Sequence, residues 1–254
     1  MSARRLTAAA ALAVALPALA YVLPVPAILR RVAEKRSALA LASLEVTGTL
    51  QAEGPAAERL AQIAGLEARG GIVTVPARLA IKVPGRCRLE LAPPEVTEAN
   101  RPFVAVHDQR TTGARGLNQL PAAVALVRSA CALLAIPSGA GGADAYAAAL
   151  SRRGVALSGA TLGRFDGRIA YVIGGREKSD HPLAYVDKES FQPMRLVSAE
   201  GGTTFDVRLL GWGSPTGGDW FPRAVEVWEK DQPRLRFTTE RPTPNPRIQD
   251  VLFP

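Results

Sequence analysis

Two-residue alternation of apolar and polar side chains, recurring from residue 167 to residue 253, constrains the fold more than any other feature. Phe205, Val207 and Leu209, for example, are separated by charged residues, and turn-forming pairs such as Gly201-Gly202 divide the alternating segments. Successive side chains of a strand point to opposite faces of its sheet. The pattern therefore predicts consecutive β-hairpins, an antiparallel meander with one apolar face and one charged face.

The rest of the chain adds strands and helices to this meander. We expect further strands at 44–51, 71–91 (a hairpin), 101–108 and 155–165. We expect helices at 26–44, 117–136 and 143–153, and a short helix or a loop at 56–66. A sheet interrupted once by a helical insert is typical of an α+β protein, and no internal repeat is present.

The N-terminal segment resembles an export signal. Arg4 and Arg5 precede an apolar run, and Ala18-Leu19-Ala20 offers a small-x-small cleavage site, which predicts a signal peptide over residues 1–20. An alternative stays open, because residues 6–29 carry no charge and are long enough to anchor the chain in the inner membrane uncut.

The charge balance is basic but gives no clear indication of a partner. The sequence has 31 Lys and Arg against 23 Asp and Glu, a formal net charge of +8. These cations are spread along strand faces, and aromatic residues make up only 6%. The pattern argues against a nucleic-acid partner. It is compatible with attraction to an anionic membrane surface or with an ordinary solvated face.

The two cysteines, Cys87 and Cys131, predict one disulfide if the chain is exported, and two buried free thiols are the alternative. Two separated Cys and the two separated histidines, His107 and His181, do not form a ligand set, so we expect no metal site. No nucleophile elbow, phosphate-binding loop or dinucleotide fingerprint is present. We therefore expect no enzymatic activity, no catalytic residues and no cofactor.

The helical insert has an unusual composition. Residues 122–150 are rich in Ala, contain no Phe or Trp, and contain one Tyr. Small side chains over an apolar sheet face could leave a cavity able to hold an acyl chain, whose burial contributes about 0.8 kcal/mol per methylene. The alternative is that the Ala-rich helices pack close to the sheet and leave no cavity.

Short motifs and their order resemble one known family. Leu-x-Val-x-Gly-Thr at Leu44 to Thr49, the segment Asp187 to Arg195 with its Pro-x-Arg, and Asn245-Pro-x-Ile-x-Asp-x-x-Phe253 are similar to LolA/LolB-type periplasmic lipoprotein carriers. That superfamily includes RseB-like sensors and mycobacterial lipid-carrier lipoproteins. The resemblance implies a strongly curved antiparallel half-barrel whose concave apolar face is covered by helices. It further implies a single domain over 26–254, with a helical lid at about 117–153.

The resemblance also implies a function. We expect a monomeric, periplasmic, non-enzymatic carrier that binds the acyl chain of a lipid or lipoprotein and exchanges it with an envelope protein or a membrane surface. The alternative is a sensor or scaffold of the same fold that binds a protein partner. The apolar parity of the strands predicts these cavity-lining residues: Val46, Val73, Val75, Leu79, Ile81, Leu89, Leu91, Phe103, Ile169, Tyr171, Ile173, Met194, Leu196, Phe205, Val207, Leu209, Val225, Val227, Leu235 and Phe237.

Overall fold

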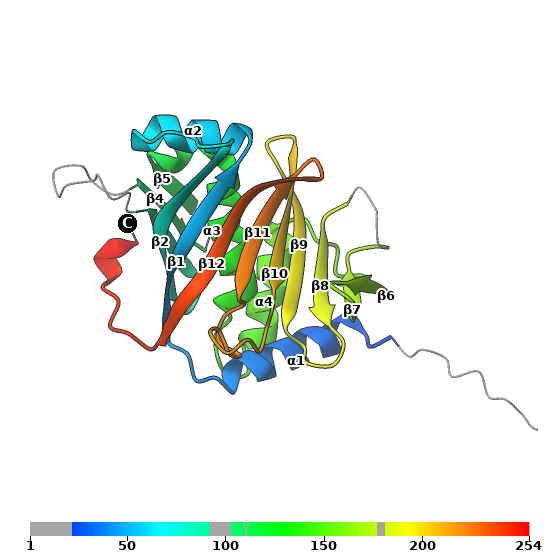
Figure 1. Cartoon of the computed structure of the whole chain (residues 1–254). Coiled ribbons are helices and arrows are strands. Elements are labelled where there is room, and N and C mark those ends of the chain that lie inside the picture. The colour runs from blue at the N-terminus through cyan, green and yellow to red at the C-terminus, as the bar shows by residue number, and fades with distance from the viewer. Residues whose placement is uncertain (1–21, 92–102, 110, 177–180, 254) are drawn as a thin grey trace, which may run out of the picture.

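One antiparallel sheet of 12 strands, in the order β5-β4-β3-β2-β1-β12-β11-β10-β9-β8-β7-β6, forms the framework of the protein (Figure 1). The structure, a computed structural model, describes residues 22–91, 103–109, 111–176 and 181–253. The predicted signal peptide, residues 1–20, lies outside these ranges.

The strands are β1 (Ser43–Glu53), β2 (Ile72–Lys82), β3 (Arg86–Leu91), β4 (Phe103–Asp108), β5 (Thr111–Arg115), β6 (Ala160–Phe165), β7 (Arg168–Ile173), β8 (Leu183–Asp187), β9 (Pro193–Glu200), β10 (Thr203–Leu210), β11 (Ala224–Glu229) and β12 (Gln232–Pro244). The helices are α1 (Val25–Ser37), α2 (Pro55–Ala64), α3 (Pro121–Leu134) and α4 (Gly142–Arg152), with short 3₁₀ turns at Leu117–Gln119 and Asp250–Leu252.

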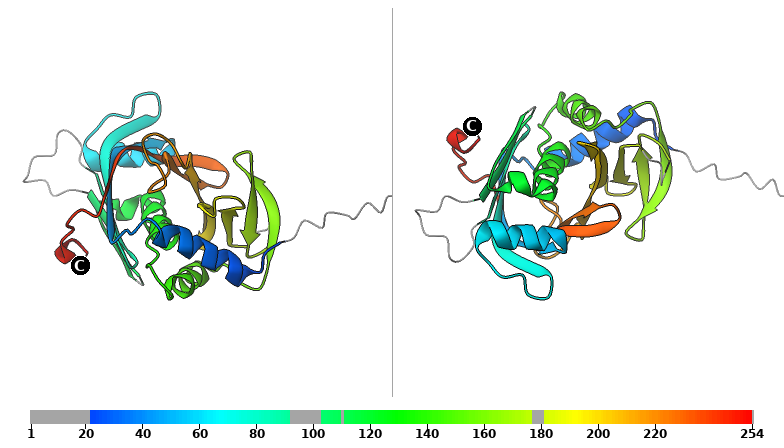
Figure 2. Two further views of the ribbon diagram at one scale, coloured as in Figure 1. Left: turned by 90° about the horizontal axis from the view of Figure 1, so that it is seen from below. Right: turned by 90° about the horizontal axis from the view of Figure 1, so that it is seen from above.

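The strand order shows how the two halves of the chain meet. From β1 the chain winds outward to β5 at one edge, crosses over through α3 and α4, and winds back from β6 at the other edge to β12. The two halves therefore meet where β1 pairs with β12, two strands from the N-terminal and C-terminal parts of the sequence. The sheet is strongly curved but does not close, and the predicted α+β half-barrel is confirmed (Figure 2).

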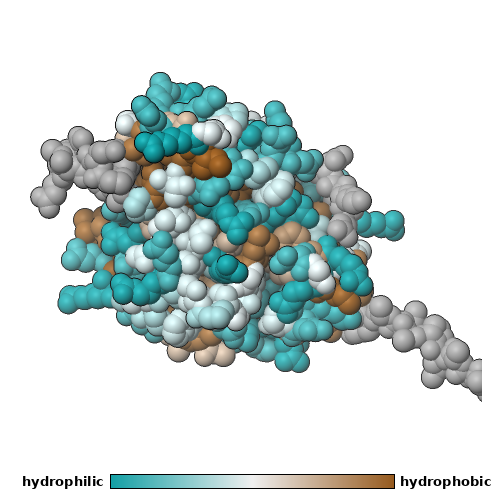
Figure 3. Space-filling model, viewed as in Figure 1, coloured by the Kyte–Doolittle hydropathy of each residue, from teal (hydrophilic) through white to brown (hydrophobic). Residues whose placement is uncertain are grey.

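Alternating burial explains why these segments are strands. In β1, Leu44, Val46, Gly48 and Leu50 are buried, and the residues that alternate with them, Glu45, Thr47 and Thr49, are partly exposed. Such a strand gains hydrophobic stabilisation only if every second side chain faces the covered side of a sheet. The opposite face of the sheet is mostly hydrophilic, as Figure 3 shows.

Helix α3 fills the concavity of the sheet. Pro121 stands at its first position, where a missing N–H costs nothing, and eleven of its 14 residues are buried. It packs on strands of both halves, β3 and β4 from one and β10 and β11 from the other (Figure 2). Helices α1 and α2 lie across opposite ends of the sheet (Figure 1), and both contribute to the same core cluster.

One expected helix ends earlier than predicted, and one observed strand was not expected. Helix α1 ends at Ser37 and not at residue 44, because Ala40 adopts a left-handed backbone (φ 50°) and β1 begins at Ser43. Strand β5 was not predicted, since Thr111–Arg115 has no apolar alternation and pairs only as an edge strand beside β4. No helix in the described ranges is both long enough and apolar enough to cross a bilayer.

The uncut-anchor alternative overlaps α1. Val25, Ile28 and Leu29, which end the uncharged segment 6–29, are buried in the core cluster. A bilayer segment would therefore have to lie before Val25 while this domain is folded.

Candidate functional site

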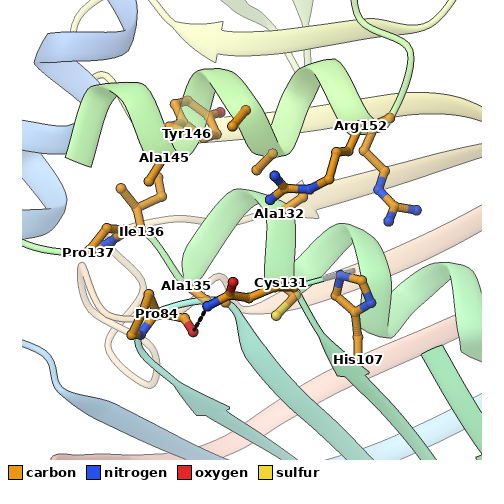
Figure 4. Close-up of a pocket in the computed structure, with 15 residues that line it drawn as sticks. Pro84, His107, Cys131, Ala132, Ala135, Ile136, Pro137, Ala145, Tyr146 and Arg152 are labelled. Atoms are coloured by element: carbon orange, nitrogen blue, oxygen red, sulfur yellow. Dashed lines mark hydrogen bonds between the residues drawn. The ribbon is translucent and has the colours of Figure 1, made fainter. Parts of the chain in front are cut away.

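A pocket of about 360 Å³ lies between α3, α4, the β2–β3 turn and the end of β4. Its walls come from four places in the sequence (Figure 4): the β2–β3 turn at Pro84, β4 at His107, the end of α3 around Ala135, and one face of α4. Most of the lining is apolar, with Ala132 on α3, Ala135 and Ile136 just after it, and Ala145 and Ala149 on α4.

Small residues on α4 make this space. Ala145, Ala148, Ala149 and Arg152 all line the pocket and follow the spacing i, i+3, i+4 and i+7, so they share one helix face. Larger side chains at the Ala positions would close the gap between α4 and α3. This face of α4 is therefore apolar at its alanine positions, and the positively charged Arg152 lies at its C-terminal end.

The pocket contains few polar groups, and two of them are His107 and Arg152. His107 points into it from β4, while Arg152 extends over it from the end of α4 (Figure 4). His107 Nδ1 is 2.9 Å from the Thr112 hydroxyl. Burial lowers the pKa of His107 to about 4, helped by the positive charges of Arg153 and Arg128. The imidazole is therefore neutral at pH 7.

Tyr146 also borders the pocket and is buried deeply. Its hydroxyl has no hydrogen-bond partner among the described residues, and burial raises the pKa of this phenol above its ordinary value. A buried hydroxyl without a partner is uncommon, because leaving it unsatisfied costs roughly 1–3 kcal/mol. A polar atom of a bound molecule, or water, would compensate that cost.

The predicted disulfide is confirmed and adjoins the pocket. Cys87 of β3 and Cys131 of α3 are bonded, with their Cα atoms 5.5 Å apart. The bond holds α3 against the sheet beside the pocket, and Cys131 contributes to the pocket wall.

Seventeen of the twenty predicted lining residues lie in one core cluster with α1, α2, α3 and α4. Phe103 packs partly against that cluster, Met194 belongs to a small cluster with Tyr185 and Val172 elsewhere, and Ile169 is 43% exposed. The pocket under α4 is lined by none of the twenty. Side chains of α3 therefore occupy the concave face where the sequence suggested open space.

Three of the residues that line the pocket, His107, Tyr146 and Arg152, were not among the predicted cavity-lining residues. The sequence analysis considered His107 only as a possible metal ligand, and it assigned no binding role to Arg152 or Tyr146. The spacing of small residues on 143–153 was the available signal. It identifies a helix face but not what lies opposite.

No protein-family model matches the sequence, and no curated protein is similar to it. Among solved structures, the chain is similar to a LolA superfamily protein from Nitrosomonas europaea with a TM-score of 0.49 and 11% identity, covering 92% of this chain and 98% of that one. A domain described as an outer membrane lipoprotein-sorting protein, from Vibrio parahaemolyticus, gives a TM-score of 0.48 and 12% identity over 89% and 95% of the two chains. Both similarities concern the fold.

Proposed function

We propose that this protein is a non-enzymatic carrier of the cell envelope that binds the acyl chain of a lipid or lipoprotein in the pocket beneath α4. The observation that carries the proposal is the apolar lining of that pocket, with Ala132 of α3 and the residues Ala135 and Ile136 that follow α3 on one side and Ala145 and Ala149 of α4 on the other. Its volume of about 360 Å³ lies within the roughly 300–1,000 Å³ of small-molecule sites.

The two parts of the predicted lid have different roles in this proposal. Helix α3 belongs to the core and is fastened to β3 by the disulfide. Helix α4 has its main contacts with α1 and α3 and lies over the layer that α3 forms. We therefore assign the lid to α4, which can move without unpairing a strand. A longer chain would reach the predicted concave-face residues only if α3 also moved.

The energetics favour an apolar ligand with a mobile cover. Each buried methylene contributes about 0.8 kcal/mol, so about eight methylenes would offset several kcal/mol of lost α4 contacts and ordering. Release would then require a membrane or partner that binds the chain comparably well, since a ligand shifts an equilibrium only by its differential affinity.

Uptake of a fluorescent sixteen-carbon fatty acid by the purified protein tests this function. Ala149→Trp places a bulky ring in the pocket and should weaken binding at least tenfold. The matched control is Ser151→Trp, because Ser151 is exposed on the same helix and does not line the pocket. Ligand should also raise the melting temperature of the wild type in a concentration-dependent way.

Two results would overturn the proposal. Equal loss of uptake in both tryptophan variants would show that α4, but not the pocket, matters. No uptake by the wild type would remove the carrier function, and the protein-binding alternative would be the one to pursue.

A further inference from the structure

Three arginines converge where α3, α4 and the β9–β10 turn meet. Arg128 comes from α3, Arg152 ends α4, and Arg153 follows it. Together with Ser198 and Glu200 of β9 they line a second hollow of about 180 Å³. Arg152 and Arg153 also line the pocket under α4, so the two spaces share a wall.

The positive charge of this cluster is not balanced. Glu200 is the one carboxylate lining the hollow, and it accepts hydrogen bonds from Arg128 Nη1 at 2.5 Å and from Arg153 Nη1 at 2.8 Å. Arg152 has no carboxylate partner in the described part of the chain, and its side chain is exposed. Three guanidinium groups against one carboxylate leave a formal charge of +2.

Burial makes this imbalance costly. The Arg153 side chain is only 7% exposed, and its pKa is lowered by burial and by the neighbouring Arg128. Arg128 and Arg153 share the single carboxylate of Glu200, which offsets their mutual repulsion only in part. An anion between them would remove that repulsion.

Unsatisfied donors point into the same place. Ser198, which is 1% exposed and lines the hollow, has a hydroxyl with no partner among the described residues. Arg128 Nε also lacks an acceptor there. Buried donors of this kind are normally paired, and an oxyanion offers acceptors for several donors at once.

We propose that Arg128, Arg152, Arg153 and Ser198 form an oxyanion site that binds the phosphate or carboxylate head group of the lipid whose chain occupies the pocket under α4. The identity of the ligand in this inference rests on the proposed carrier function. The inference goes further by assigning the head group a place and a charge. Arg152, at the wall between the two spaces, would contact the ligand where chain and head group join.

The test compares two lipids that differ only in the anion. A sixteen-carbon lysophosphatidic acid and the corresponding monoacylglycerol are titrated against the wild type by displacement of a fluorescent fatty acid. The phosphate-bearing lipid should bind at least about tenfold more tightly, as a charge-assisted contact predicts. Arg152→Gln should reduce the ratio of the two affinities to near one. Ser198→Ala should reduce it several-fold without lowering the melting temperature.

The control is Arg164→Gln, since Arg164 is exposed on β6 and lines neither the pocket under α4 nor the hollow, and it should keep the full ratio. Equal binding of the two lipids by the wild type would overturn the oxyanion site while leaving the carrier function standing. An unchanged ratio in Arg152→Gln would also overturn it.

Stabilisation by inorganic phosphate tests the oxyanion site independently of the carrier function. Phosphate should raise the melting temperature of the wild type but not of Arg152→Gln. If neither lipid binds, the carrier function fails, and this measurement alone decides the site: stabilisation confined to the wild type supports it, and no stabilisation rejects it.

Discussion

At the scale of single residues, His107 shows how an environment changes an ordinary side chain. It is 4% exposed, lies beside the disulfide-linked end of the pocket, and faces Arg128 from α3 and the two arginines that end α4. Burial comes first among the causes that lower its pKa to about 4, and these positive charges act in the same direction. The folded protein therefore resists protonation of this imidazole.

This predicts an acid sensitivity that belongs to one residue. The unfolded chain takes up a proton at the ordinary imidazole pKa of 6.5, whereas the folded protein does so only near 4. Stability is unaffected above pH 6.5 and falls as the pH is lowered from about 6.5 to 4, by up to about 3 kcal/mol. Urea unfolding of the wild type and His107→Gln at several pH values measures the difference. If the free energy of unfolding changed with pH in the same way in both proteins, the assignment of this acid sensitivity to His107 would be contradicted.

Asp187 shows a second residue-scale effect. Its carboxylate is 1% exposed, and Oδ1 accepts hydrogen bonds from the backbone N–H groups of Glu189 and Ser190 and from the Ser190 hydroxyl. Arg168 Nε lies 2.9 Å from Oδ2. The Asp-x-x-Ser pattern in the motif from Asp187 to Arg195 is therefore a structural turn, which explains the likeness without implying a binding role.

At the scale of elements, the pairing of β1 with β12 depends on one glycine. Gly48, the glycine of the Leu-x-Val-x-Gly-Thr motif, lies where the register shifts between Thr47 and Gly48. A Cβ there would come within 2.1 Å of the Thr238 carbonyl oxygen. The strand can approach β12 this closely only without a side chain. The bulge lies at the junction of the two halves of the sheet.

Gly48→Ala should therefore lower the free energy of unfolding by roughly 2–3 kcal/mol, the typical cost of forcing extra atoms into a packed region. Gly113→Ala in β5 is the matched control, because a Cβ at Gly113 meets nothing within 4 Å. Its effect should stay below about 0.5 kcal/mol. Similar losses in chemical denaturation of the two variants would show that the contact with Thr238 is not what matters.

At the scale of the whole molecule, the C-terminal segment connects the link between α1 and β1 with the outer face of the sheet. Asn245 accepts a hydrogen bond from the Ala42 backbone N–H at 2.8 Å and donates one to the Ala40 carbonyl at 3.1 Å. Beyond it, Phe253 is buried with Val104 and Val106 on the outer face of the sheet. The segment thus covers an apolar patch and fastens the link between α1 and β1.

Ending the chain after Pro244 should expose that patch, lower the melting temperature by roughly 5–10 °C and increase binding of an apolar dye. Asp250→Ala is the informative contrast. Its carboxylate pairs with Lys82 and Arg86, but the side chain is 68% exposed, so the melting temperature should barely change. A large loss in Asp250→Ala would mean that the ion pairs, and not the apolar packing, hold the segment.

The sequence by itself determined most of the strands, hairpins and helices, because alternation, turn residues and Ala-rich stretches act over a few residues. It also indicated the Cys87–Cys131 disulfide and the half-barrel class. It missed the edge strand β5, whose residues have no apolar alternation. Only the tertiary structure decided that α3 fills the concave face, that the pocket lies beneath α4, and that Arg128, Arg153 and Glu200 meet. Those features depend on the distance between layers and on contacts between residues far apart in the chain, which no local pattern specifies.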